Sequence, residues 1–111
     1  MIKVIIKKNK QQIEEIKITG HANSAEYGKD LVCAGVSTAS VGIANALVKK
    51  DFLKHGTIDI REGFVHIKVN QSERDIQVVL ETFEVILELL RNLILNTLKS
   101  RKWRYKPWCS N

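Results

Sequence analysis

The 111-residue chain is 44% hydrophobic and 27% charged and contains a single Pro, which is the composition of one globular domain. That composition excludes a disordered, collagen-like or disulfide-scaffold protein, and no apolar run approaches the ~20 residues of a membrane span. The formal net charge of +6 is concentrated at the C-terminus, because residues 99–111 hold 5 of the 18 basic residues and none of the 12 acidic ones. We therefore expect a domain over residues 1–100 that has no basic face for nucleic acid, followed by a basic, Trp-containing tail over residues 101–111.

The start of the chain is predicted to form a hairpin. Residues 2–8 read as a strand, and residues 12–19 read as a second strand because isoleucines alternate there with polar residues. The small and polar residues 21–29 have no periodicity and are predicted to form a loop, which at that length in a small domain is often functional. The first apolar stretch is too short for a signal peptide, so we expect a cytoplasmic protein whose two Cys are reduced.

A helix is predicted from Leu31 to Lys50, with Asp30 as its N-cap. Large apolar residues at helical spacing give this helix one apolar stripe, while most of its other positions are Ala, Ser or Gly. Gly35 and Gly42 in a helix interior cost about 1 kcal/mol each relative to Ala. These small residues favour a close approach, either by the sheet or by a ligand.

The second half of the chain is predicted to form another hairpin and a long helix. Residues 57–61 and 64–69 read as strands that flank a Glu-Gly turn. Residues 73–100 are predicted to be helical, because large apolar residues keep a 3.6-residue period there. The fold class is therefore α+β, with the order ββαββα and a mostly antiparallel sheet packed with two helices. The strand order is left open.

The long helix carries more apolar residues than one core face requires. Val78, Val85 and Leu89 lie beside the main stripe and would expose large apolar side chains in a monomer. Association with a second copy of the chain would cover them, so we expect a homodimer.

His21 and Cys33 form the most promising pair for chemistry. His21 directly follows the end of a predicted strand, and Cys33 lies in the first turn of the predicted helix. Free backbone N–H groups and the positive end of the helix dipole stabilise a thiolate at such a position, and a nearby imidazolium would add to that effect. The same N–H groups could stabilise the oxyanion of a tetrahedral intermediate. The spacing alone leaves open that Cys33 is a small buried hydrophobe and His21 an ordinary surface residue.

Two sequence blocks around this pair carry a family resemblance. Gly20-His21-Ala22, followed by the segment DLVCAGVS from Asp30 to Ser37, resembles the G-H-A … D-x-V-C-A-[AG]-V-S signature of the ribosomal-processing cysteine proteases, the Prp or YsxB-like family. The resemblance covers roughly residues 1–98, because the ββαββα order and the long final helix also fit. The basic tail departs from the family pattern, and its role is left open.

The resemblance implies that His21 and Cys33 are the catalytic dyad of a cysteine endopeptidase and that Asp30 and Ser37 support it. It implies no metal or organic cofactor. It also implies a cytoplasmic bacterial homodimer that removes a short, apolar N-terminal extension from large-subunit ribosomal protein twenty-seven. Asp30 could orient His21 or only cap the helix, and both roles stay open.

The loop after the second strand is expected to help bind the peptide substrate. Gly20 and Ala22 belong to the first sequence block, and Tyr27 offers an apolar contact within the loop. Two other classes of function remain as alternatives. One is a non-catalytic module that binds ribosomes or RNA through the basic tail, and the other is a redox-responsive dimer in which Cys33 is a sensor thiol.

Overall fold

The computed structural model describes residues 2–20 and 29–99, and its elements follow the predicted ββαββα order. The strands are β1 (Lys3–Asn9), β2 (Gln12–Thr19), β3 (Gly56–Arg61) and β4 (Phe64–Val69). The helices are α1 (Lys29–Lys49) and α2 (Arg74–Lys99), and a short 3-10 helix that was not predicted, η1 (Phe52–Lys54), connects α1 to β3. The α+β class is confirmed. Within the described part of the chain, neither helix is long and apolar enough to cross a membrane.

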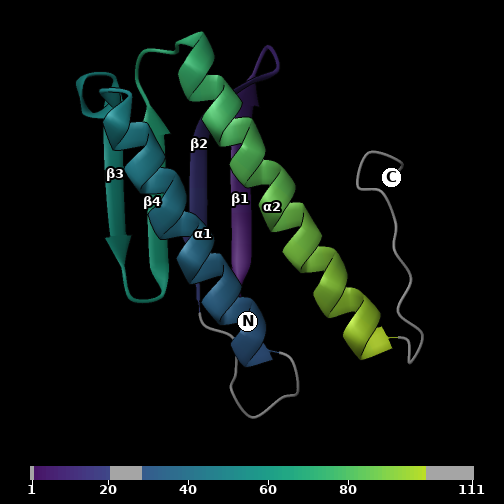
Figure 1. Ribbon diagram of the computed structural model, residues 1–111. Coiled ribbons are helices and arrows are strands. Elements are labelled where there is room, and N and C mark those ends of the chain that lie inside the picture. The colour runs from purple at the N-terminus through teal and green to yellow at the C-terminus, as the bar shows by residue number, and fades with distance from the viewer. Residues whose placement is uncertain (1, 21–28, 100–111) are drawn as a thin grey trace.

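The four strands form one antiparallel sheet in the order β1-β2-β4-β3, so the two hairpins lie side by side with β2 and β4 in the middle. Both helices pack on the same face of this sheet (Figure 1). Where β2 pairs with β4, Ile16 lies opposite Ile67 and Ile18 lies opposite Val65. All four are buried. The alternation of apolar residues along the strands therefore decides which face the helices cover.

The hydrophobic core lies between that face of the sheet and the two helices. From α2 it takes four residues of the predicted apolar stripe, each at most 7% exposed: Ile76, Leu80, Phe83 and Leu87. Burying a side chain of this size stabilises the folded state by about 1.5–3 kcal/mol. The strands, α1 and η1 supply the rest of the buried cluster: Ile13, Ile16, Ile18, Val36, Ile43, Leu47, Phe52, Val65 and Ile67.

A buried polar contact fixes the start of α2 on the sheet. The side-chain amide of Gln77 accepts a hydrogen bond from the backbone N–H of Ile13 at 2.8 Å and donates one to the backbone carbonyl of Ile13 at 2.9 Å. Ile13 is 1% exposed, so these backbone groups cannot reach water. Gln77 thus satisfies two buried groups that would otherwise destabilise the fold.

The start of α1 differs from the prediction. The helix begins at Lys29, so Asp30 lies inside its first turn and is not the N-cap. Cys33 is consequently the fifth helical residue. The predicted helix start was wrong because an Asp before an apolar run fits two positions. It can be the N-cap, and it is also favoured within the first turn of a helix.

The small residues of α1 have different structural reasons. A Cβ atom added at Gly35 would lie 3.0 Å from Cδ2 of Leu90, so Gly35 allows α2 to approach closely. A Cβ atom added at Gly42 would meet nothing within 4 Å. A close approach therefore occurs at Gly35, but the partner is the other helix, and the sequence-based expectation of the sheet or a ligand was wrong at this position.

The sheet face turned away from the helices carries a cross-strand acid–imidazole pair. Nε2 of His66 on β4 hydrogen-bonds the carboxylate of Glu15 on β2, and Nζ of Lys7 on β1 lies 3.5 Å from the same carboxylate. The hydrogen bond from His66 holds the pKa of the Glu15 carboxyl below its ordinary value of 4.5; partial burial opposes this shift and Lys7 supports it. Ionised Glu15 therefore favours the folded state.

We expect the contribution of Glu15 to stability to depend on pH. Because its pKa is lower in the folded than in the unfolded chain, its contribution is present above about pH 4.5 and is lost as the pH falls through the lower folded value. Glu15→Gln should therefore lower the urea midpoint at pH 7 and have little effect at about pH 2.5. Glu14→Gln on the same strand is the matched control. A Glu15→Gln effect of equal size at both pH values would contradict this account.

Candidate functional site

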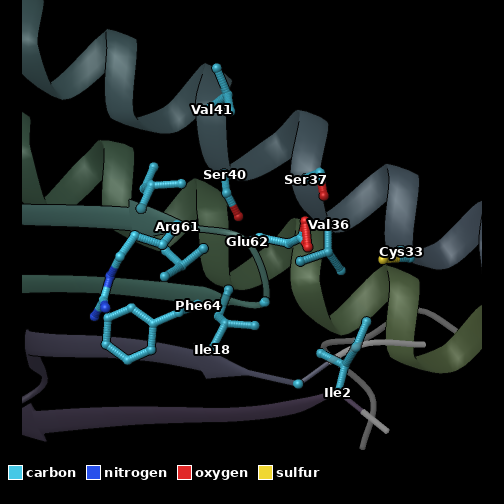
Figure 2. Close-up of a pocket in the computed structure, with 14 residues that line it drawn as sticks. Ile2, Ile18, Cys33, Val36, Ser37, Ser40, Val41, Arg61, Glu62 and Phe64 are labelled. Carbon is cyan, nitrogen blue, oxygen red and sulfur yellow. The ribbon is translucent and has the colours of Figure 1, made fainter. Parts of the chain in front are cut away.

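A cavity of about 190 Å³ lies between α1 and the end of the sheet where β2 ends and β3 turns into β4 (Figure 2). Most of its lining is apolar, and a few polar groups reach it from the helix and from the turn. The lining residues are Ile2, Ile18, Gly20, Cys33, Val36, Ser37, Ser40, Val41, Ile60, Arg61, Glu62, Gly63, Phe64 and Val65. An apolar cleft with a few polar groups is the usual form of a ligand site.

Cys33 lies at one end of this cavity as a free thiol. It shares one face of α1 with Val36 and Ser40, at three- and four-residue spacing, and that face continues to Leu47. Burial decreases along the face, because Leu47 is 0% and Val36 is 9% exposed while Cys33 is only half-buried. The helix face that packs on the sheet therefore opens toward solvent at Cys33.

A backbone contact holds the other wall of the cavity. The N–H of Gly20, at the end of β2, donates a hydrogen bond of 3.0 Å to the carbonyl oxygen of Gly63 in the β3–β4 turn. Gly20 has a φ of 99° and Gly63 a φ of 72°, both in the region that favours glycine. The chain thus leaves β2 beside the cavity at a fixed position, one residue before His21.

Two hydroxyl groups of α1 belong to the same cavity. Ser37, which the sequence analysis singled out, is exposed and lies one helical turn after Cys33. Ser40, which it missed, is 1% exposed, and its Oγ has no hydrogen-bond partner within the described residues. Figure 2 shows the Ser40 hydroxyl directed from the helix toward the sheet. Its spacing of seven residues from Cys33 is the sequence signal that could have identified it.

The β3–β4 turn brings charged groups to the rim of the cavity. The Arg61 guanidinium lies 3.2 Å from the Asp59 carboxylate and 4.5 Å from the centre of the Phe64 ring. Glu62 is exposed at the tip of the turn. The sequence did not predict this wall of the cavity. The wall depends on the pairing of β2 with β4, which brings the turn to Gly20, and no short-range sequence pattern indicates that pairing.

The structure therefore brings Gly20, Cys33 and Ser37 together at one cavity. The predicted site residues His21, Ala22 and Tyr27 lie outside the described residues, and so does the side chain of Asp30. Among residues 2–20 and 29–99, no three side chains of His, Cys, Asp or Glu gather as a metal site would require.

Comparisons with known proteins agree on one family. A family model described as cysteine protease Prp matches residues 1–99. The ribosomal processing cysteine protease Prp of Staphylococcus aureus is 32% identical over 93 residues, which cover 81% of this chain and 88% of that protein. The Bacillus subtilis protein of the same name is 45% identical over 49 residues, 43% of this chain and 44% of that protein.

Solved structures show the same similarity in three dimensions. The crystal structure of the S. aureus protease Prp in complex with a substrate peptide gives a TM-score of 0.71 at 29% identity, and the match covers 96% of this chain and 100% of that one. The same protease with a covalently linked product peptide gives a TM-score of 0.70 at 31% identity, with 84% and 91% covered.

The two glycines that face different surroundings should respond to Ala in opposite directions. Gly63→Ala should lower the free energy of unfolding by about 1–2 kcal/mol, because an L-residue is strained at a φ of 72°. Gly42→Ala should raise it by about 0.5–1 kcal/mol, since the position is helical and has free space. Urea unfolding measures both. A Gly63→Ala protein as stable as the unmodified chain would contradict the strain expected for an L-residue at this position of the cavity wall.

Proposed function

Since the chain belongs to the Prp family of cysteine proteases, we propose that it is a cysteine endopeptidase with Cys33 as its nucleophile and His21 as its base. The observation that carries this proposal is the position of Cys33: it is a half-buried free thiol near the start of α1, and it lines a largely apolar cavity. Gly20 lines the same cavity and directly precedes His21.

The proposed reaction uses these groups in two steps. Sγ of Cys33 attacks the scissile carbonyl carbon, and His21 accepts the thiol proton and donates it to the leaving amine. The resulting thioester is hydrolysed by water, which loses a proton to His21, and the thiol is restored. Cα–Cβ bonds tilt toward the N-terminus of a helix, so the Cys33 side chain leans toward the first turn of α1. Free N–H groups of that turn would stabilise the oxyanion.

The cavity suits an extended apolar peptide. It follows α1 from Cys33 to Val41, and eight helical steps of 1.5 Å correspond to about 12 Å. That distance accommodates three or four residues of extended chain. Ile18, Val36 and Ile60 give it apolar walls. A short apolar segment next to the scissile bond is the substrate that such walls favour.

We propose that the substrate is the short N-terminal extension of large-subunit ribosomal protein twenty-seven, cleaved in the bacterial cytoplasm during ribosome maturation. Two observations support this: the family resemblance of the sequence blocks, and the apolar lining of the cavity. No cofactor takes part in the proposed reaction.

Supporting roles are proposed for five further residues. Gly20 sets the direction of the chain before His21 through its bond to Gly63, and Ser37 offers a hydroxyl to the bound peptide one turn from the nucleophile. Asp30 lies in the first turn of α1, where a carboxylate is favoured by the helix dipole and could also orient His21. Ala22 and Tyr27 are proposed to contact substrate.

Replacement of the nucleophile should abolish cleavage and keep the fold. Cys33→Ala and Cys33→Ser should each lower kcat/KM by at least about 10³-fold, because neither side chain supplies a thiolate. The assay is cleavage of a synthetic peptide that spans the processing junction, followed by mass spectrometry under reducing conditions. Urea unfolding of the same variants should match the unmodified chain within about 1 kcal/mol.

Cys109→Ser is the matched control, since it removes the other thiol and should leave kcat/KM unchanged. It also tests the redox alternative, in which Cys109 would be needed as a resolving thiol. Cleavage of the peptide by Cys33→Ala or Cys33→Ser at a rate near that of the unmodified chain would show that the nucleophile is another residue.

We further propose that the protein is a twofold homodimer with α2 at its interface. Val78 is 52% and Val85 is 38% exposed, and Leu89 follows on the same stripe as a half-buried residue. Three large apolar side chains at seven- and four-residue spacing form a continuous strip on the helix. A second copy with the same strip would remove it from water.

Val78→Glu combined with Val85→Glu should convert the dimer to a monomer, because the substitutions place four charges in the twofold interface. Sedimentation velocity at micromolar concentration measures the change. Arg91→Glu, which changes the charge of each protomer by the same two units on a different face of the same helix, is the control that should remain dimeric. If the unmodified chain itself sediments as a monomer under these conditions, the dimer proposal is wrong.

A further inference from the structure

The face of the sheet that both helices leave open has a defined set of side chains. In the central pair, Lys17 of β2 lies opposite His66 of β4, and Thr19 lies opposite Phe64. The outer strands add their own alternate residues in the same register: Lys3, Ile5 and Lys7 from β1, and Thr57, Asp59 and Arg61 from β3. Both helices lie on the other side of the sheet (Figure 1). No described element covers this face.

This open face is basic. Among the residues with a register partner, it carries five Lys or Arg side chains and two carboxylates, together with one His: Lys3, Lys7, Lys17, Lys68 and Arg61 against Glu15 and Asp59, with His66. Glu14 lies beside Glu15 at the bulge in β2. Both carboxylates are paired, Glu15 with His66 and Lys7, and Asp59 with Arg61. Lys3, Lys17 and Lys68 are exposed and are not engaged by these carboxylates. They are available to an anionic partner.

The near balance of charge over the whole domain conceals this face. The described exposed and half-buried charges of α2 through Arg91 are mostly acidic: Asp75, Glu81, Glu84 and Glu88 against Arg74 and Arg91. The described part of α2 therefore carries a net charge opposite to that of the open face. The sum of charges along the sequence predicted no basic face, because that sum adds the positive charges of the open face to the negative charges elsewhere in the domain.

Planar groups occupy the end of the basic face that lies next to the β3–β4 turn. The Phe64 and His66 rings lie side by side on β4, with their centres 6.2 Å apart. The Arg61 guanidinium covers the Phe64 ring at 4.5 Å from its centre. Single-stranded bases stack on aromatic rings and guanidinium groups, and nearby lysines bind the phosphates. The Phe64 ring, the Arg61 guanidinium and the lysines of this face offer both kinds of contact.

We propose that the open sheet face binds single-stranded RNA, with Lys3, Lys17 and Lys68 contacting phosphates and the Arg61–Phe64–His66 row contacting bases. A second copy of the chain fits this face poorly, because two faces with an excess of positive charge repel one another. The face borders the cavity at Cys33, because Arg61 and Phe64 also line that cavity. Lys3, Lys17 and Lys68 do not line it, so loss of these lysines should leave peptide cleavage unchanged.

The test is binding of a fluorescein-labelled oligouridine of about 12 nucleotides to the full chain, measured by anisotropy at several salt concentrations. The variant carries Lys3→Gln, Lys17→Gln and Lys68→Gln. For single strands each phosphate contact contributes about 0.7 to the slope of log K against log salt. Loss of three contacts should make that slope shallower by about 2 and weaken binding by about 100-fold at 0.1 M salt.

The matched control carries Lys49→Gln, Lys50→Gln and Lys54→Gln, which remove the same charge from exposed positions at the end of α1 and in η1. It should bind within about threefold of the unmodified chain. Peptide cleavage should be unchanged in both variants.

Four results would overturn the proposal. One is no binding by the unmodified chain, and another is equal weakening in both triple variants. The third is loss of binding only when Arg101, Lys102 and Arg104 are replaced, which would assign the RNA to the C-terminal tail. The proposal would also be wrong if polyglutamate displaced the labelled oligouridine as strongly as unlabelled RNA does. That result would show that the face attracts any polyanion.

Discussion

The site depends on one packing constraint, which is that a single face of α1 lies on the sheet and is fully buried at one end only. Leu47 and Ile43 fix the C-terminal half of that face in the core. Cys33 belongs to the same face but lies beyond the buried part, where the sheet ends. A helix is stiff, so anchoring its far half determines where its first turns lie. The position of the thiol is therefore set by core packing some distance away.

The second wall of the cavity is set by backbone hydrogen bonding. The bond between Gly20 and Gly63 joins the end of one hairpin to the turn of the other, and both residues adopt a positive φ. Gly35 has a related role on the helix side, because it lets α2 approach α1 through Leu90. Small residues thus fix the relative positions of the two hairpins and the two helices around Cys33.

Much of this architecture could be predicted from the sequence, because it depends on local periodicity. The strands, both helices and the buried stripe of α2 follow from residues such as Ile16, Leu80 and Phe83, whose spacing alone indicates which side is buried. The strand order could not be predicted, since pairing of β2 with β4 is decided by long-range contacts. The wall formed by Glu62 and Gly63 was missed for that reason. The predicted N-cap at Asp30 was wrong because helix ends are weakly specified by a single residue.

The central claim is that Cys33 cleaves the N-terminal extension of a ribosomal protein. The most direct measurement is the intact mass of large-subunit ribosomal protein twenty-seven, with its extension, after incubation with the reduced protein. The account predicts one shortened product whose new N-terminus lies after the extension, and an unchanged mass with Cys33→Ala. An uncleaved substrate with the unmodified protein, or the same product with Cys33→Ala, would contradict it.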